Sequence, residues 1–160
     1  MIRLEKVNGQ NAWDLIKLRV GEDQRAFVAP NDVSLIEAYL ALAGGAYAFP
    51  FGIYDGETPV GFLMIGFGAE EAWENPPEIA RLNYSLWRLM IDERCQRRGY
   101  GREAIGLALD FVRTFPCGPA EYCWLSYEPQ NAVARELYRS FGFRENGEMD
   151  GDEIIAVLKL

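Results

Sequence analysis

The chain has 160 residues, of which 49% are apolar, so it is long enough and apolar enough to bury one core. Its formal net charge of −8 argues against nucleic acid as the main partner, and no apolar run reaches the roughly 18 residues that a membrane helix needs. The N-terminal residues alternate like a strand and show no signal-peptide pattern. We therefore expect one domain over residues 1–160, a cytoplasmic location, and neither a nucleic acid nor a membrane as partner.

The residue types limit the chemistry. The chain contains no histidine, which excludes a Ser-His-Asp triad, a Cys-His pair and any histidine-ligated metal site. Its three cysteines are odd in number and form no C-x-x-C, which argues against a disulfide framework or a zinc site. Acid–base catalysis must therefore use carboxylates, tyrosine, cysteine, lysine or water, and no metal is expected.

The first 45 residues predict a strand followed by two helices. Residues 2–7 alternate and indicate a strand, and residues 11–20 have helical periodicity with Trp13, Ile16 and Val20 on one face. Asn31 or Asp32 is expected to cap a second helix, which the Gly44-Gly45 pair ends. The side chains of this helix that should face the core are Leu35, Ile36, Tyr39 and Leu40.

The middle of the chain predicts three strands. Residues 47–54 and 59–66 should pair as a hairpin, because Asp55-Gly56 between them is a strong turn signal. An acidic loop over residues 69–78 separates this hairpin from a longer strand at 81–91.

The remaining residues predict a helix, a strand, a helix and a hairpin. The helix at 102–115 should bury Ile105, Ala108, Val112 and Phe115. A strand over 122–127 precedes a helix that Pro129 opens and that runs to residue 141. Residues 143–149 and 153–160 form a closing hairpin around Asp150-Gly151. This mixture of hairpins and crossover helices indicates an α/β (α+β mixed) fold with a mixed sheet.

A glycine loop between a strand and a helix is the strongest functional signal. An apolar run at 86–91 precedes the segment Gln96-Arg97-Arg98-Gly99-Tyr100-Gly101, and a helical pattern starts at Arg102. Free N–H groups at a helix N-terminus bind phosphates, and glycine lets the backbone approach the anion. The spacing fits neither a P-loop nor the G-x-G-x-x-G dinucleotide motif. A pyrophosphate-bearing ligand is predicted, although the loop alone is equally consistent with an ordinary turn.

A second group of residues lies on the helix that follows Pro129. Asn131 and Tyr138 are seven residues apart, so they project from one helical face together with Ala134. Gly142 is expected to end this helix. The alternative interpretation is that Asn131 caps a turn and Tyr138 belongs to the core.

Together the two motifs resemble the acyl-CoA signature of the GNAT superfamily of N-acetyltransferases. The segments at 86–94, 125–131 and 141–150 resemble its bacterial spermine/spermidine (diamine) acetyltransferase branch. The resemblance implies a mostly antiparallel sheet of about seven strands flanked by about four helices, and acetyl-CoA as the cofactor. It also implies that the sheet splays between the strands at 81–91 and 122–127, so that the cofactor arm fills the gap like an added strand.

The resemblance assigns roles by position. Backbone groups of Leu89, Met90 and Ile91 would bind the pantetheine arm, and Gln96 with the amides from Arg97 to Arg102 would hold the pyrophosphate. Asn131 and Ala134 would contact the arm near the thiol. Tyr138 would sit beside the sulfur as the general acid, because a phenol can protonate a thiolate at small cost.

The acceptor side is less defined by the resemblance. Some polyamine acetyltransferases carry a carboxylate on the central strand where this chain has Trp87 and Arg88, so no direct base is visible. A polyamine needs carboxylates along an aromatic channel. The candidate carboxylates are Glu22, Asp23, Glu37, Glu70, Glu71, Glu74 and Glu128, and the candidate walls are Phe27, Trp73, Tyr84 and Trp87. The alternative interpretation is that the acids are ordinary surface charges and the aromatics belong to the core.

The predicted function is transfer of acetyl from acetyl-CoA to a primary amine of a small cation such as spermidine or spermine, by direct attack in a ternary complex. The alternatives are a protein or peptide N-acetyltransferase and a non-catalytic acyl-CoA sensor. A homodimer is common in the family that the chain resembles.

Overall fold

A seven-stranded sheet forms the centre of the computed structural model, which describes residues 1–160. The strand order is β1-β2-β3-β4-β5-β7-β6, and only the β4–β5 pair is parallel. The strands are β1 Ile2–Lys6, β2 Tyr47–Asp55, β3 Thr58–Phe67, β4 Tyr84–Ile91, β5 Tyr122–Tyr127, β6 Arg144–Asp150 and β7 Glu153–Lys159. The predicted element order and the mixed, mostly antiparallel sheet are confirmed.

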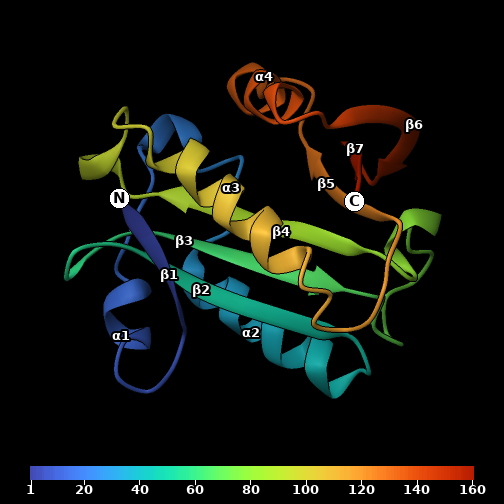
Figure 1. The fold of residues 1–160 in the computed structure, drawn as a ribbon, viewed down its shortest axis with the longest axis horizontal. Coiled ribbons are helices and arrows are strands. Elements are labelled where there is room, and N and C mark those ends of the chain that lie inside the picture. The colour runs from blue at the N-terminus through green and yellow to red at the C-terminus, as the bar shows by residue number, and fades with distance from the viewer.

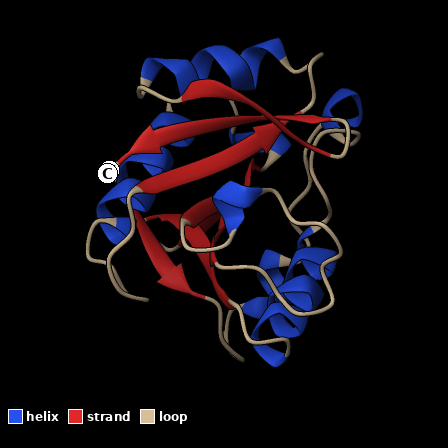
Figure 2. Cartoon of the chain, turned by 90° about the vertical axis from the view of Figure 1, so that its right-hand side faces the viewer, coloured by secondary structure: helices blue, strands red, loops and turns tan.

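Helices cover both faces of the sheet (Figure 1, Figure 2). They are α1 Ala12–Leu15, α2 Asn31–Ala43, α3 Tyr100–Val112 and α4 Ala132–Ser140, with single 3₁₀ turns at Glu22–Gln24, Glu78–Ala80 and Glu93–Cys95. Successive residues of the central strands point alternately into two hydrophobic cores on opposite faces of the sheet. Ile53 and Leu63 pack under α3, whereas Phe62 and Met64 pack with α1 and α2. We call these two sides the α3 face and the α2 face. None of the helices has the length and apolar character required to cross a bilayer.

The first predicted helix is much shorter than expected. It ends after Leu15, and Trp13 is 70% exposed, whereas Leu15 and Leu18 are buried. The reason is a tertiary contact: the Arg19 N–H donates to the Asp92 carboxylate at 3.1 Å, which draws the chain toward the end of β4 instead of continuing the helix. The predicted stripe of Trp13, Ile16 and Val20 is therefore wrong for Trp13.

The second helix presents the opposite face from the one predicted. Small residues contact the sheet, with Ser34, Ala38 and Ala41 buried, because α2 lies close against β2. Ile36 and Tyr39 are exposed, as is half of Leu40, and only Leu35 is partly buried against the core. The helix ends as predicted, with Gly44 as C-cap and Gly45 at φ +86°. The predicted cap at Asn31 or Asp32 is wrong: Pro30 is the N-cap, no side chain caps the helix, and the buried Asn31 amide donates to the Leu15 carbonyl at 2.8 Å instead.

Three further boundaries differ from the sequence prediction. The β4 strand begins at Tyr84 because residues 78–80 form a 3₁₀ turn, and α3 ends at Val112, which leaves Phe115 37% exposed. Pro129 precedes α4 rather than opening it, because the Asn131 side chain caps the helix by accepting from the Ala134 N–H at 3.3 Å.

The sheet splits between its two central parallel strands. Only Tyr84–Cys123 and Ser85–Trp124 are paired, so β4 and β5 separate toward their C-terminal ends, as the resemblance implied. Figure 1 shows β5 running away from β4 toward α4. Beyond Ser85, the edge of β4 that faces β5 makes no ladder.

A bulge in β4 lies at the start of the split. Met64 pairs with Arg88 and Ile65 pairs with Leu86, so Trp87 is an extra residue. The bulge places both Trp87 and Arg88 on the α2 face, where Trp87 packs with the α2 core and Arg88 forms an ion pair with Glu37 of α2 at 2.6 Å. Without the bulge, alternation would direct one of these two side chains to the α3 face.

Candidate active site

A groove with a volume of about 1360 Å³ runs through the split in the sheet. On the α3 face it is lined by the glycine loop before α3 and by residues of α4. On the α2 face it is lined by the β4 bulge, α2, the acidic loop and the β6–β7 hairpin. The split therefore joins an anion-binding loop on one face with a carboxylate-rich pocket on the other.

The glycine loop is built to receive an anion. No backbone N–H from Arg97 to Arg102 donates a hydrogen bond within the protein, and all of them lie at or just before the N-terminus of α3. Arg97 and Gly99 adopt left-handed conformations, with φ of +64° and +85°, and left-handed residues of this kind group successive amides into anion-binding concavities. The strained Arg97 backbone is a conformation that functional loops tolerate.

Of the side chains around this loop, most are hydrogen-bonded within the protein and one arginine is free to bind a ligand. Arg97 lines the groove and makes no ion pair, so its guanidinium remains available to a phosphate. Arg102 instead donates to Ser140 of α4 at 3.0 Å, and Tyr100 donates to Asp55 at 2.5 Å. Gln96 holds the loop in place by donating to the Ile91 carbonyl at 2.9 Å. Arg98 donates to the Arg94 carbonyl at 3.3 Å and does not line the groove.

Of the three β4 residues predicted to bind through their backbone, only Leu89 and Ile91 face the groove, because successive residues of a strand direct their backbone groups to opposite sides. The Asp92 N–H bonds to Val60 of β3 at 2.9 Å, so the backbone of Met90, two residues earlier, also faces β3. Leu89 therefore presents its N–H and C=O groups to the groove, and Ile91 presents its N–H, because the Ile91 carbonyl accepts from Gln96. Met90 differs from the expectation: its backbone faces β3, and its side chain is buried in the α2 core.

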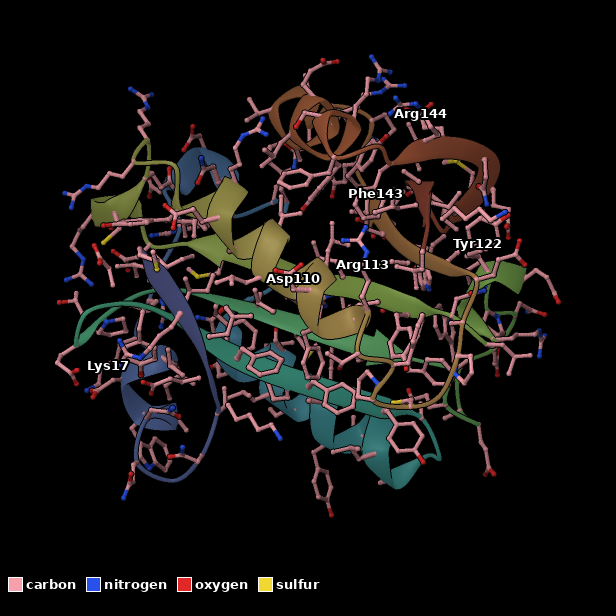
Figure 3. The ribbon with its side chains drawn as sticks, in the orientation of Figure 1. Lys17, Asp110, Arg113, Tyr122, Phe143 and Arg144 are labelled. Carbon is pink, nitrogen blue, oxygen red and sulfur yellow. The ribbon has the colours of Figure 1, made fainter.

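The residues predicted on α4 come together on the α3 face. Asn131, Ala134 and Tyr138 all line the groove. The Tyr138 ring stacks on Tyr127 with centroids 6.2 Å apart, and it meets the edge of Phe143 at 6.1 Å. Figure 3 shows Phe143 between α4 and β5. The Tyr138 hydroxyl has no hydrogen-bond partner in the protein, and burial raises the pKa of Tyr138 to about 12.

The raised pKa changes one expectation. Proton transfer from a phenol of pKa about 12 to a thiolate whose thiol has an ordinary pKa near 8.5 costs about 5 kcal/mol, which is more than the small cost that the residue types alone suggest. Tyr138 stays protonated at neutral pH, so the arrangement favours donation of a hydrogen bond to a thiolate.

The predicted acceptor residues are only partly brought together. The predicted residues that line the groove are Asp23, Phe27, Glu37, Glu70, Trp73, Trp87 and Glu128. The prediction is wrong for Glu22, Glu71 and Glu74, whose exposed side chains lie outside the groove. It is also wrong for Tyr84, which is fully buried and donates to the Gly118 carbonyl at 2.8 Å.

Two acidic residues were missed from the sequence. Asp150 and Glu153 close the β6–β7 hairpin and line the groove beside Glu128. Their place in a predicted hairpin turn suggested only a surface location. The signal that could have found them is the pairing of β5 with β7, which brings Glu153 next to Glu128, but this pairing joins segments distant in sequence.

Comparison with known proteins identifies the family of this chain. The model of the acetyltransferase (GNAT) family matches residues 13–143. The chain belongs to the GNAT acetyltransferase family. It is 30% identical over 152 residues to a spermine/spermidine N(1)-acetyltransferase of Bacillus subtilis strain 168, covering 93% of this chain and 91% of that protein. A probable spermine N(1)-acetyltransferase of Bacillus subtilis subsp. natto is 28% identical over the same shares.

Solved structures of other GNAT enzymes share the fold. The aminoglycoside acetyltransferase AAC(6')-Ib in complex with coenzyme A superposes with a TM-score of 0.76 at 15% identity, covering 99% of this chain and 95% of that one. The PaiA N-acetyltransferase of Thermoplasma acidophilum, also with coenzyme A, gives 0.65 at 16% identity, covering 100% and 99%. The protein is thus a GNAT N-acetyltransferase whose cofactor is acetyl-CoA.

The residues present fit this cofactor. The free amides before α3 and the Arg97 guanidinium suit a pyrophosphate, and the unpaired edge of β4 suits the amide-bearing pantetheine arm. When bound, acetyl-CoA supplies an activated acetyl thioester.

Proposed function

We propose that this GNAT enzyme acetylates a primary amine of a small polycation, with spermidine or spermine as the preferred class of acceptor, by direct attack in a ternary complex. The observation that carries the proposal is the charge of the groove. Six carboxylates line it against three guanidiniums; the acids are Asp23, Glu37, Glu70, Glu128, Asp150 and Glu153, and the bases are Arg25, Arg88 and Arg97.

The charge is concentrated on the α2 face. Arg97 belongs to the anion-binding loop, and Arg88 is already paired with Glu37, so the acids of the acidic loop and of the hairpin remain to attract cations. Trp73 and Trp87 supply apolar walls for methylene segments between ammonium groups. The Bacillus subtilis relatives carry names that give spermine and spermidine as acceptors, which agrees with this chemistry.

The roles follow from the two faces of the split. The amides from Arg97 to Arg102 would hold the pyrophosphate, with Leu89 and Ile91 binding the pantetheine arm along the open edge of β4. Asn131 and Ala134 would flank the arm near its sulfur, and Tyr138 would donate a hydrogen bond to that sulfur.

The test is release of free CoA thiol from acetyl-CoA with a panel of acceptors. The panel contains spermidine, spermine, putrescine, a monoamine, an aminoglycoside and a peptide. We expect saturable turnover with the polyamines, and a kcat/KM that falls as salt screens the groove. Preference for the aminoglycoside or the peptide would overturn the polyamine assignment. Binding of acetyl-CoA with no amine turnover would favour an acyl-CoA sensor.

Replacing one groove acid tests whether its position in the groove, and not only its contribution to the net charge of the protein, attracts the polyamine. Glu70→Gln is expected to raise the KM for spermidine about fivefold, because a partly exposed ion pair contributes about 1 kcal/mol. The matched control is Glu71→Gln, which removes the same charge from an exposed neighbour outside the groove and should leave KM within about twofold. Equal effects of the two substitutions would contradict a binding role for Glu70.

A further inference from the structure

Glu153 lies on the acceptor side of the split. Ser126 of β5 pairs with Ile155 of β7, and Tyr127 pairs with Ile154. Because paired residues share a face and successive residues alternate, Glu153 lies on the same face as Ile155 and Ser126. Tyr127 lies on the other face, where it stacks on Tyr138. Glu153 and Tyr138 therefore line the same groove from opposite faces of the sheet.

The surroundings of Glu153 come from three elements. Asp150 pairs with it across the β6–β7 hairpin, Glu128 follows β5, and Arg88 projects from the β4 bulge. Burial raises the pKa of Glu153, Asp150 raises it further, Arg88 lowers it, and Glu128 raises it. Glu153 and Arg88 both line the groove, so this carboxylate shares the groove with the bulge at which the two strands begin to part.

Two of the other groove carboxylates are placed less favourably for accepting a proton. Glu37 is held by Arg88 at 2.6 Å. Glu70 lies in the loop that follows β3, whereas Glu153 begins a strand of the half-sheet that forms one wall of the split. The bulge of β4 contributes only Trp87 and Arg88 on this face, and neither can serve as a base, because an indole N–H is only a donor and a guanidinium stays protonated.

We propose that Glu153 is the base that accepts a proton from the acceptor's ammonium group. This inference rests on the proposed amine acetylation. One proton passes from the ammonium to the Glu153 carboxylate, and the neutral nitrogen forms a bond to the acetyl carbon as the carbon–sulfur bond breaks. The second proton leaves the nitrogen and ends on the sulfur, with Tyr138 as hydrogen-bond donor there. Glu153 returns its proton to water, so the products are the N-acetyl amine, free thiol and one proton.

The raised pKa of Glu153 agrees with this role. A carboxylate that holds a proton more strongly than usual is a better base toward an ammonium, provided it is ionised before the reaction. The wild-type kcat/KM should therefore fall as the pH decreases through the pKa of Glu153, and this acidic limb should lie above the ordinary range of a glutamate.

The test compares Glu153→Gln with Asp152→Asn in spermidine acetylation from about pH 4, near the ordinary pKa of a glutamate, to about pH 10, near the usual pKa of a primary amine. Asp152 is the exposed neighbour in the same turn and does not line the groove, so its substitution removes an equal charge. We expect Glu153→Gln to lower kcat/KM at pH 7 at least about tenfold. This loss should shrink toward pH 10 as the free amine forms in solution, and the acidic limb should disappear. Asp152→Asn should keep the wild-type profile.

Two controls distinguish a base role for Glu153 from misfolding of the variant and from a role in binding alone. The affinity for acetyl-CoA and the melting temperature should be unchanged in Glu153→Gln, which excludes misfolding as the cause. A loss that is the same at every pH, or a rise in KM alone with the acidic limb retained, would overturn the base role and leave Glu153 as a binding residue only. Wild-type enzyme that turns over no amine would instead remove the proposed function on which this inference rests.

Discussion

Tyr138→Phe is expected to lower kcat for acetyl transfer at least about tenfold while leaving acetyl-CoA affinity within about twofold. The hydroxyl lines the groove without a partner in the protein, so it is free to donate to the departing sulfur. Burial raises its pKa to about 12, and the phenol therefore stays protonated across the usable pH range. Steady-state kinetics with the preferred amine, together with acetyl-CoA titration, measures both quantities.

Tyr127→Phe is the matched control for this substitution. Its ring stacks on Tyr138, but its hydroxyl donates to Glu145 at 2.9 Å. Removing this hydroxyl should cost about 1 kcal/mol of folding free energy and little activity. If Tyr127→Phe and Tyr138→Phe lowered kcat equally, packing of the ring pair and not hydrogen-bond donation to sulfur would be the property that matters.

Gly99→Val is expected to raise the KM for acetyl-CoA at least about tenfold, because a β-branched residue at φ +85° costs about 1–3 kcal/mol and the loop relaxes away from its amide-presenting shape. The effect should appear in cofactor binding more than in kcat, since the reacting groups lie elsewhere in the groove. Direct titration of CoA and steady-state kinetics with varied acetyl-CoA check it.

Gly106→Ala on the same helix controls for a change of glycine as such. Gly106 has ordinary helical φ, and an added Cβ would meet no atom within 4 Å. The substitution should stabilise α3 by about 0.5–1 kcal/mol and leave KM unchanged. Gly99→Val with normal CoA affinity and only a lower melting temperature would show that the loop before α3 is not the phosphate site.

The predictions that held depend on local signals. Tyr122–Tyr127 forms β5 over the predicted residues, and the turn glycines end helices or close hairpins where expected. The loop at Gln96–Gly101 was predictable for the same reason: a strand, a left-handed glycine and a helix N-terminus are properties of neighbouring residues.

The predictions that failed concern tertiary contacts, which depend on how helices and strands distant in sequence pack together. An apolar stripe on α2 indicated a buried face, but Ala38 and Ala41 contact the sheet and Tyr39 points outward, because close approach of helix and sheet favours small residues. The bulge at Trp87 reverses the alternation of side chains between the two faces along β4, and the hydrophobic pattern of the strand does not indicate it. Glu153 becomes a groove residue only through pairing between β5 and β7.

The two-pair ladder between β4 and β5 has a consequence for the protein's mechanics. One half of the sheet, β1 to β4, is joined to the other half, β5-β7-β6, by the pairs at Tyr84 and Ser85 alone. A ligand that forms hydrogen bonds with the open edge of β4 and also contacts α4 would connect the two halves where the ladder between β4 and β5 is missing. In the binding mode proposed above, acetyl-CoA would be a removable structural part, and because it would bind the folded chain, its free concentration would set how firmly the halves are held together.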